Sequence, residues 1–319
     1  MIFSMILLAA YGIDRWIGDP RSLPHPVIGM GKAITAIEKV IRRFVTRQRS
    51  LRAAGILLPL TVVGGAWALT AVLLWLLSLI SPWLMWAAEA WLISTTIASK
   101  GLKDAGMAVY SELRKGDLPA ARRAVGMIVG RDTTQLDSPE IVRGTVETVA
   151  ENIVDAITSP LFYALLGGAP LAMAYRAVNT LDSMVGYKND KYRDLGWASA
   201  RLDDVANLIP ARITALLLVL CSRLLRYDWV RSLRTVRRDA RLHPSPNSGY
   251  PESAVAGALG IRLGGENVYH GVRSFRAYMG DPTRPLEPED ILRTSRMMLL
   301  CSSIFVGLCA AIAWIGFGG

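Results

Sequence analysis

The chain has 319 residues, a formal charge of +10 and 52% hydrophobic residues, with a mean hydropathy of +0.32. Its charged residues lie between long uncharged runs, which excludes an ordinary soluble domain. Nucleic-acid binding is excluded as well, because no basic stretch is interleaved with the aromatic residues that stack on bases.

The uncharged runs predict an all-α fold, that of a polytopic helical membrane protein. Positions 53–88 contain no ionisable residue, and Glu89 is the first one after them. About 20 apolar residues cross a bilayer, so this stretch is predicted to hold two spans that turn at Ser81-Pro82. Residues 297–319 form another uncharged run of spanning length. The whole chain, residues 1–319, is therefore expected to be a single integral-membrane domain.

The N-terminal region combines a short apolar helix with a polar loop. Residues 1–13 lack the basic start of a signal peptide, so they are predicted to be a retained membrane helix. Three prolines between positions 20 and 26 prevent a regular helix in the segment that follows. We expect a rigid loop there, which is either a membrane-exit turn or a ligand site containing Asp14, Asp19 and His25. The basic residues 32–52 are expected to stay in the cytoplasm.

Residues 100–152 are predicted to form a cytoplasmic helical insertion. Its last helix is expected to begin at Ser138 as the N-cap residue, with a proline directly after it. Glu151 and Asp155 belong to an acidic stripe with a four-residue repeat, which is either a solvated face or a site. Because this stripe runs into uncharged sequence, where an ionised group is costly, we favour a ligand or Mg²⁺ role for Glu151, Asn152 or Asp155.

The uncharged run at residues 156–175 is interrupted by Pro160 and by Gly167-Gly168-Ala169-Pro170. Such breaks occur in complete spans and in re-entrant pairs of half-helices, and both topologies stay open. Residues 205–222 contain a proline and an arginine and make only a marginal span.

A polar, flexible loop that begins at Asn179 offers oxygen ligands and cations together. Asp182 is its carboxylate, and the next helix is expected to open at Ala200 and to include Asp203 and Asp204. Mg²⁺ prefers a few carboxylates together with substrate phosphates, and the basic residues of the loop suit those phosphates. Acidic residues also favour a helix start, but this explains two adjacent carboxylates less well than one.

Residues 226–296 are predicted to be an amphipathic and cytoplasmic region. Six arginines accompany apolar residues at positions 226–241, which indicates a helix lying on anionic headgroups. A proline-rich loop at 243–252 leads into a helix of small residues at 253–259. The predicted turn at 264–267 either holds an anion on its backbone amides or is an ordinary loop.

Several familiar sites are excluded by pattern. The three cysteines lie in apolar runs without metal-ligand spacing, so they are predicted to be core residues. Gly29-Met30-Gly31-Lys32 is too short for a P-loop, and the sequence contains neither a zinc-protease motif nor a nucleophile elbow.

Five polar motifs follow one another along the chain: Asp14 to Pro20 with Pro24-His25-Pro26-Val27; Val149-Ala150-Glu151-Asn152 with Asp155 and Ser159-Pro160-Leu161-Phe162; Asn179-Thr180-Leu181-Asp182-Ser183-Met184-Val185-Gly186-Tyr187; Ala200-Arg201-Leu202-Asp203-Asp204 to Ile209-Pro210-Ala211-Arg212; and Asn247-Ser248-Gly249-Tyr250-Pro251. Together they resemble the adenosylcobinamide-phosphate synthase family of cobalamin biosynthesis. The resemblance covers nearly the whole chain, with the motifs in the right order.

The resemblance implies an ATP-dependent acid–amine ligase, which joins a propionate of adenosylcobyric acid to aminopropanol phosphate or a related amino alcohol. A carboxylate does not condense with an amine unaided, so ATP would convert it to an acyl phosphate, with Mg²⁺ and cations offsetting the phosphate charge. The resemblance also implies a multi-pass protein of the inner cell membrane with a cytoplasmic active face. Its partners would be the two substrates, membrane lipid and other membrane enzymes of late cobalamin assembly.

We assign roles to the polar residues of these motifs as hypotheses. The catalytic candidates are Asp155, Asp182, Asp203 and Glu151. The substrate-binding candidates are Asn152, Asn179, Lys188, Arg193, Arg201, Arg212, His25 and Asp19. The Mg²⁺ ligands are expected among Asp182, Asp203 and Asp204. The carboxylates and cations that flank the glycine-proline break are expected to gather at one water-filled pocket that opens to the cytoplasm.

Two other classes of protein have some of these features. A phosphoalcohol or prenyl transferase also uses membrane-embedded aspartates with Mg²⁺, but the chain has neither a clear D-x-x-D repeat nor a D-G-x-x-A-R pattern. A transporter would explain broken helices and buried charge, yet no internal repeat is evident.

Overall fold

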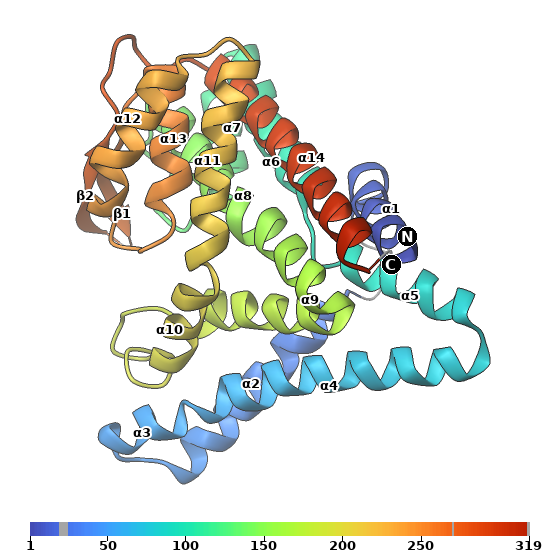
Figure 1. Cartoon of the computed structure of the whole chain (residues 1–319). Coiled ribbons are helices and arrows are strands. Elements are labelled where there is room, and N and C mark those ends of the chain that lie inside the picture. Colours follow the sequence, from blue (N-terminus) through green and yellow to red (C-terminus); the bar gives the residue numbers. More distant parts are fainter. Residues whose placement is uncertain (19–24, 270, 318–319) are drawn as a thin grey trace. The chain divides into compact units, whose positions relative to one another are not determined.

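The computed structural model describes residues 1–18, 25–269 and 271–317 (Figure 1). Asp19, a predicted substrate-binding residue, lies outside the described residues. The chain forms two compact units, each built from segments far apart in sequence. The first unit contains residues 1–98, 159–207 and 306–319, and the second contains residues 99–158 and 208–305.

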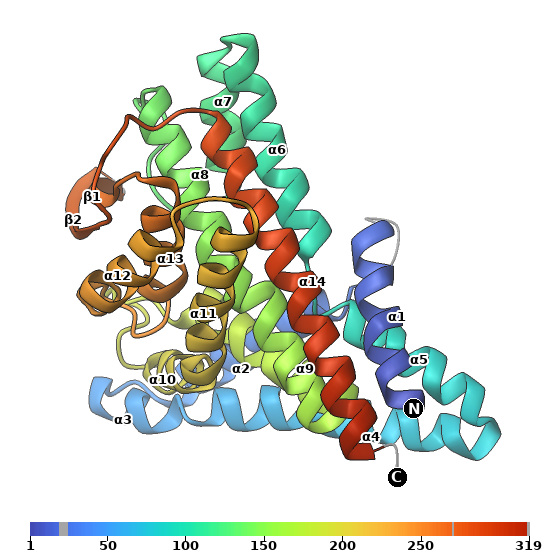
Figure 2. The same ribbon diagram turned by 45° about the horizontal axis from the view of Figure 1, so that its top comes forward.

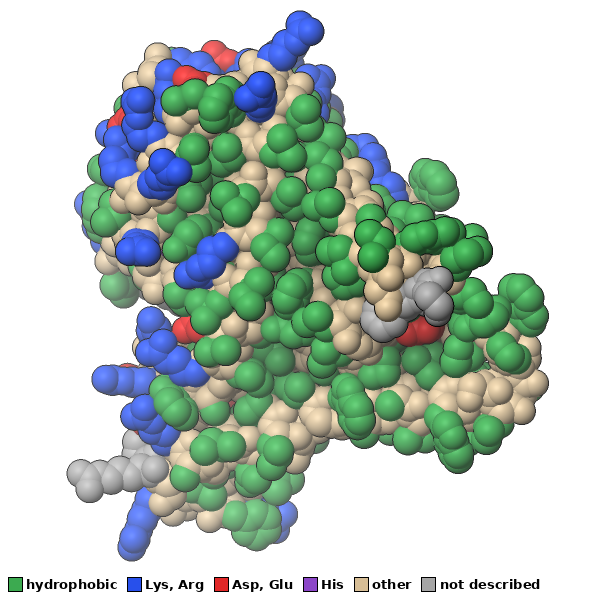
Figure 3. Space-filling view, viewed as in Figure 1, with side chains coloured by type: hydrophobic (Ala, Val, Ile, Leu, Met, Phe, Trp, Pro, Cys, Tyr) green, Lys and Arg blue, Asp and Glu red, His purple; other side chains and the backbone are tan. Residues whose placement is uncertain are grey.

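Helices, joined by loops, are the only regular secondary structure in the described residues of the first unit. Its helices are α1 (Ile2–Trp16), α2 (Pro26–Phe44), α3 (Gln48–Ala54), α4 (Leu57–Ile80), α5 (Pro82–Ser94), α9 (Ser159–Val185), α10 (Trp197–Ala206) and the end of α14 (Glu289–Phe317). Helices α2, α4 and α9 share a core that includes Ile34, Leu58 and Leu181, each fully buried. The outer surface of α4 is apolar as well, and Figure 3 shows hydrophobic side chains covering α4 and α5. A helix that is apolar all round is typical of a membrane span.

Three helical segments of the described chain are long and apolar enough to cross a membrane: Ser50–Ile80, Ser138–Val185 and Glu289–Gly316. Helices α10 and α11 (Leu208–Leu224) pass the same test as a pair. The predicted all-α, polytopic membrane fold is confirmed. Helix α5 has 13 residues, fewer than the roughly 20 that a bilayer requires. This helix alone is therefore too short to be the second membrane span predicted for positions 53–99.

Helix α9 is broken at two glycines and changes direction there (Figure 1). Gly168 has a φ of 64°, a conformation that glycine adopts at no steric cost. The N–H of Ala169 begins the second half-helix and donates to Oε1 of Glu89 at 3.4 Å, and a Cβ on Gly168 would overlap that carboxylate. Glu89 therefore caps the second half-helix, where a negative charge is favourable. Pro160 follows the π-helical turn Val154–Thr158, and the helical run Ser138–Val185 continues through it.

The second unit combines helices with one small hairpin. Its elements are α6 (Ser99–Lys115), α7 (Leu118–Gly126), α8 (Ser138–Ile153), the π-helical η1 (Val154–Thr158), α11 (Leu208–Leu224), α12 (Trp229–Asp239), the 3₁₀ turn η2 (Ala240–Leu242), α13 (Gly249–Leu259), β1 (Leu263–Tyr269), β2 (Val272–Met279) and most of α14. Helix α6 lies beside α14 (Figures 1 and 2). The two approach at Gly106, where a Cβ would lie 3.5 Å from Ile291 Cγ2 and 3.5 Å from Val149 Cγ2 of α8.

The hairpin is a feature that the sequence did not predict. Strands β1 and β2 are antiparallel, with Glu266 opposite Phe275 and a register shift between Leu263 and Gly265. Gly264 and Gly265 have φ values of 83° and 95°, so this bulge needs glycine. The turn predicted at 264–267 is wrong, because these residues lie within a strand.

Helix α12 has the amphipathic character predicted from its arginines. Its Ser232 packs on Gly257 of α13 and donates its hydroxyl to the carbonyl of Ala254 at 2.8 Å. Lys and Arg side chains cover its outer surface in Figure 3. Contact of that surface with lipid headgroups stays a prediction.

Three local predictions need correction. Asp14 does not lie in a loop but in the last turns of α1, where it is buried. Asn179 and Asp182 lie within α9 and not in a flexible loop, which begins only at Gly186. The N-cap of α8 is Asp137, whose side chain accepts from the Glu140 N–H in a capping box.

Candidate functional site

The acidic stripe of α8 begins with a fully paired carboxylate. Glu147 is 4% exposed. Arg131 Nη2 donates to its Oε2 at 2.6 Å, and the N–H of Gly264 donates to its Oε1 at 2.9 Å. Arg143 donates to the same Oε1 at 3.4 Å and to the carbonyl of Gly264 at 2.7 Å. Because a buried carboxylate requires such partners, Glu147 fixes the hairpin against α8.

The next carboxylate of the stripe has a different environment. Glu151 is half-buried, and its Oε1 accepts from the hydroxyl of Ser248 at 2.8 Å. Ser248 directly precedes α13. Arg212 of α11 holds this segment, because it donates to Oδ1 of Asn247 at 3.2 Å and lies 4.4 Å over the ring of Tyr250. The structure therefore brings Glu151 and Arg212 to the same motif.

His243 and Glu252 form a buried pair beside that motif. The His243 Nε2 lies 3.7 Å from the Glu252 Oε1, and the two side chains are 6% and 1% exposed. His243 Nδ1 accepts from the N–H of Ser245 at 3.0 Å, so the proton of a neutral imidazole is on Nε2 and points toward Glu252. Neither Nε2 nor Oε1 has a hydrogen-bond partner among the described residues.

Burial favours the uncharged form of both members of this pair. It raises the pKa of Glu252 well above its ordinary value, and the negative charges of Glu151 and Glu147 raise it further. Burial lowers the pKa of His243, against the opposing effect of Glu151. A carboxylate of raised pKa is the stronger base, which is a property of groups that accept protons in catalysis.

Arg276 of β2 supplies the cation of this region. Burial lowers its pKa, but the pKa is raised overall by Tyr269 and by the carboxylates of Glu252 and Glu151. Its Nη2 donates to the hydroxyl of Tyr269 at 3.1 Å, and it forms no salt bridge within the described part of the chain. We call Glu151, His243, Ser248, Glu252 and Arg276 the α13 cluster.

In the first unit, Asn207 is the centre of a separate polar network. Its Oδ1 accepts from Ser159 Oγ at 2.6 Å and from Tyr175 OH at 2.9 Å, and its Nδ2 donates to Asp203 Oδ2 at 3.0 Å. Tyr163 and Tyr175 stack with their ring centroids 5.1 Å apart. This network ties both halves of α9 to the end of α10 and orients Asp203.

The other predicted residues of the first unit lie at and beyond the end of α9. Asp182 is half-buried, and a Cβ on Gly186 would overlap its carboxylate, so the chain turns tightly over it. Asn179 accepts from Arg176 at 3.3 Å. Lys188 and Arg193 are exposed in the loop after α9. Arg42 of α2 holds this loop, because its Nη2 donates to the carbonyl of Lys191 at 2.7 Å.

Four more predicted residues lie elsewhere in the described chain. Arg201 pairs with Asp204 of its own helix at 3.3 Å. His25 is the N-cap of α2 and accepts from the N–H of Val27 at 3.3 Å. Asn152 donates to the carbonyl of Thr148 at 2.9 Å, and Asp155 is half-buried in η1.

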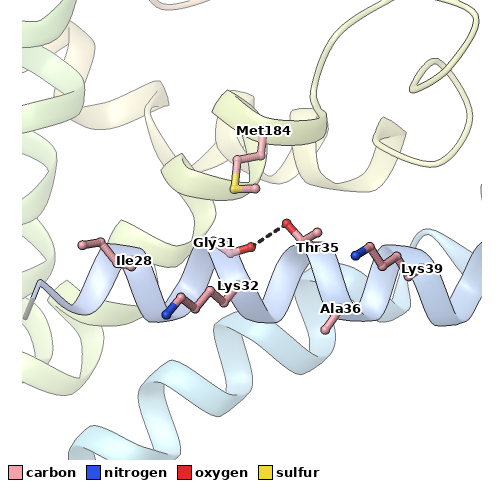
Figure 4. A pocket seen from close by; sticks show the side chains of 7 residues that line it. All are labelled: Ile28, Gly31, Lys32, Thr35, Ala36, Lys39 and Met184. Atoms are coloured by element: carbon pink, nitrogen blue, oxygen red, sulfur yellow. Dashed lines mark hydrogen bonds between the residues drawn. The ribbon is translucent and has the colours of Figure 1, made fainter.

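An open pocket of about 480 Å³ lies along α2 and is closed on one side by Met184 of α9 (Figure 4). Lys32 and Lys39 extend from different turns of its α2 wall, with Thr35 between them. The two ammonium groups beside an otherwise apolar surface suit an anionic group. The basic character of this segment predicted only its orientation in the membrane.

The described residues contain no group of three or more His, Cys, Asp or Glu that could hold a metal ion. Asp182, Asp203 and Asp204 do offer the oxygen atoms that Mg²⁺ prefers. Mg²⁺ commonly takes only one or two protein carboxylates together with substrate phosphates, so binding of Mg²⁺ by one or two of these aspartates stays a prediction.

The family model described as CobD/Cbib protein matches residues 7–298. The chain belongs to the CobD/CbiB family. It is 50% identical to the cobalamin biosynthesis protein CobD of Citrobacter koseri over 303 residues, which are 95% of each chain. The protein of the same name from Klebsiella pneumoniae is 50% identical over 97% of this chain and 98% of its own. The cobalamin biosynthesis protein CbiB of Salmonella typhimurium is 48% identical over 95% of each chain. No solved structure matches the chain.

Membership of the CobD/CbiB family confirms the resemblance drawn from the five motifs. Four members of the α13 cluster, His243, Ser248, Glu252 and Arg276, were not among the residues predicted for the site. One signal was present in the sequence: Glu252 is the single charged residue of a helix otherwise made of small and apolar residues. A charged residue in such a helix is buried and needs partners.

Proposed function

We propose that this protein acts in cobalamin synthesis as an ATP-dependent ligase, which joins a propionate of adenosylcobyric acid to aminopropanol phosphate or a related amino alcohol. The observation that carries the proposal is the near full-length similarity to relatives named cobalamin biosynthesis proteins. The order and content of the polar motifs support the specific ligase reaction within cobalamin synthesis.

The chemistry requires activation of the carboxylate. The propionate oxygen would attack the γ-phosphorus of ATP and release ADP, which gives an acyl phosphate. The amine nitrogen would then attack the acyl carbon, an amide bond would form, and phosphate would leave. Cations stabilise the charge that develops on the phosphoryl oxygens, and a carboxylate takes the proton of the amine.

The available side chains suggest a division of these tasks. Lys188 and Arg193 are exposed cations that suit phosphate groups, whereas Arg212 holds the segment of residues 247–250 in place. Asp182 is the foremost candidate ligand for Mg²⁺, with Asp203 and Asp204 as further candidates. Mg²⁺ would neutralise phosphate charge when bound. Asn207 keeps the carboxylate of Asp203 in one orientation.

The same proposal places the protein in the inner membrane with its active face in the cytoplasm. The cysteines of the described chain are buried, so a Lys188→Cys variant would give one exposed thiol. A membrane-impermeant maleimide should label it only after cells are opened. Labelling in intact cells would place this loop outside the cytoplasm.

Purified protein with ATP, adenosylcobyric acid and aminopropanol phosphate tests the reaction. The ligase predicts ADP and a heavier corrinoid in equal amounts, and no heavier corrinoid when the amine is left out. A transferase would form product without ATP, and a transporter would form none.

A further inference from the structure

We propose that the α13 cluster binds the ammonium group of the amino-alcohol substrate between Glu151 and Glu252, and that Glu252 takes a proton from it before the amide bond forms. This inference rests on the proposed function and assigns its amine step to residues of the second unit.

The local charge of the α13 cluster favours a bound cation. Glu147 is already paired with Arg131 and Arg143. Glu151 has a hydroxyl as its partner and Glu252 has a neutral imidazole, and neither forms a salt bridge with Lys or Arg in the part of the chain that the structure describes. Arg276 and Arg131 act on Glu252 electrostatically, but among the described residues neither forms a salt bridge with Glu151 or Glu252. The two acidic side chains can therefore still receive a positive charge.

The position of the two carboxylates also favours a bound cation. Ser248 donates its hydroxyl to Glu151, and its carbonyl accepts from the N–H of Glu252 at 3.3 Å. Residues four apart lie on one face of a helix start, so Ser248 and Glu252 face the same side of α13. Glu151 is half-buried and Glu252 is 1% exposed. A cation from solvent would therefore meet Glu151 first.

One carboxylate oxygen of the cluster lacks a hydrogen-bond partner among the described residues. Oε1 of Glu252 is fully buried and accepts no hydrogen bond from any described residue. A buried polar atom that is left unsatisfied is destabilising. An N–H of the ammonium group would satisfy it, while His243 Nε2–H at 3.7 Å keeps the carboxylate in place from the other side.

The proton step is balanced without any further reactant. Burial favours a neutral Glu252 in the free protein, so binding of the ammonium group first displaces the proton of Glu252 to solvent. One N–H bond of the ammonium then breaks and one O–H bond forms on Glu252, so the nitrogen keeps its electron pair. The neutral amine attacks the acyl phosphate, a C–N bond forms, the C–O bond to phosphate breaks, and the remaining excess proton leaves with phosphate.

Hydroxylamine separates this step from the activation of the carboxylate, because it is largely uncharged at neutral pH and needs no base. With ATP and adenosylcobyric acid, the wild-type protein should form the hydroxamate. Glu252→Gln should form it at the wild-type rate, while the rate of amide formation with aminopropanol phosphate falls by about 100-fold or more. Glu151→Gln should show the same split and a raised KM for the amine.

Glu266→Gln is the matched control, since Glu266 is an exposed carboxylate of β1, and both of its reactions should stay unchanged. Amide formation by Glu252→Gln at the wild-type rate would overturn the inference. Loss of the hydroxamate in a variant that elutes like the wild type would overturn it too, because Glu252 would then act before the amine. If Glu252→Gln does not fold, Glu151→Gln decides by the same criteria. Absence of ADP and hydroxamate with the wild-type protein would instead reject the proposed function itself.

Discussion

The Nε2 of His243 lies 3.7 Å from the Oε1 of Glu252, and both atoms are buried without a hydrogen-bond partner among the described residues. Burial favours the neutral form of each group, so the pair carries little charge in the free protein. A pair of this kind changes the dependence of stability on pH, and it remains available to a ligand that brings a charge of its own.

Glu252 should make the protein less stable as the pH rises. Its pKa is raised in the folded state, mainly by burial and then by Glu151 and Glu147 of α8. Its contribution is therefore complete below the ordinary pKa of about 4.5 and is lost as the pH rises through the raised value. Thermal unfolding of Glu252→Gln in detergent between about pH 5 and pH 8 should show a smaller loss of Tm with rising pH than the wild type.

The charged groups around Glu252 set the limits of this test. They are Glu147 and Glu151 of α8, Arg131 of the loop before α8, His243, and Arg276 of β2. His243 acts in the opposite direction, since its lowered pKa makes its contribution present above about pH 6.5 and lost as the pH falls. If Tm fell equally steeply with rising pH in the wild type and in Glu252→Gln, the buried, neutral state of Glu252 would be contradicted.

The buried ion pair of Arg131 and Glu147 should contribute far more than an exposed one. Their side chains are 6% and 5% exposed, so Arg131→Ala leaves a buried carboxylate with reduced compensation and should cost about 3–5 kcal/mol of unfolding free energy. Arg273→Ala removes a pair with Glu266 whose side chains are 80% and 54% exposed, and it should cost about 0–1 kcal/mol. Chemical denaturation of both variants measures their unfolding free energies. Similar losses of unfolding free energy in the two variants would be evidence against a larger contribution from the buried ion pair.

The break in α9 should depend on a single glycine. Gly168→Ala forces a side chain into a φ of 64° and against the carboxylate of Glu89, so it should destabilise the protein by at least about 1–2 kcal/mol. Gly64→Ala in α4 is the control, because nothing lies within 4 Å of its added Cβ. It should stabilise by about 0.5–1 kcal/mol. A Gly168→Ala protein as stable as the wild type would show that the break does not need this conformation.

Asp182→Ala should lower the rate of product formation by about 100-fold or more, while the protein stays in the membrane fraction. The proposed reason is loss of an oxygen ligand for Mg²⁺ and the phosphates. Asp190→Ala is a suitable control, since Asp190 is exposed in the loop that follows α9. Product yield per milligram of membrane protein measures both variants, and substantial turnover by Asp182→Ala would remove Asp182 from the mechanism.

Features that depend on local sequence could be predicted. The uncharged runs predicted α4 and α14, and the glycine-proline motif predicted the break in α9, because hydropathy and backbone preference act within a few residues. Contacts between distant segments could not be predicted. The paired state of Glu147 depends on Gly264, which lies 117 residues later in the chain. The pairing of His243 with Glu252 and the hairpin at 263–279 are local in sequence, but their burial depends on the elements packed around them. Asp14 was misplaced because the prolines after it suggested an earlier end to α1.

The fate of oxygen in the carboxylate tests the central claim most directly. Adenosylcobyric acid labelled with ¹⁸O in its reactive propionate would be incubated with the protein, ATP and aminopropanol phosphate. Attack of that carboxylate on ATP predicts that one ¹⁸O per turnover appears in the released inorganic phosphate, together with ADP. Product formation with unlabelled phosphate would contradict activation by an acyl phosphate, and with it the proposed mechanism.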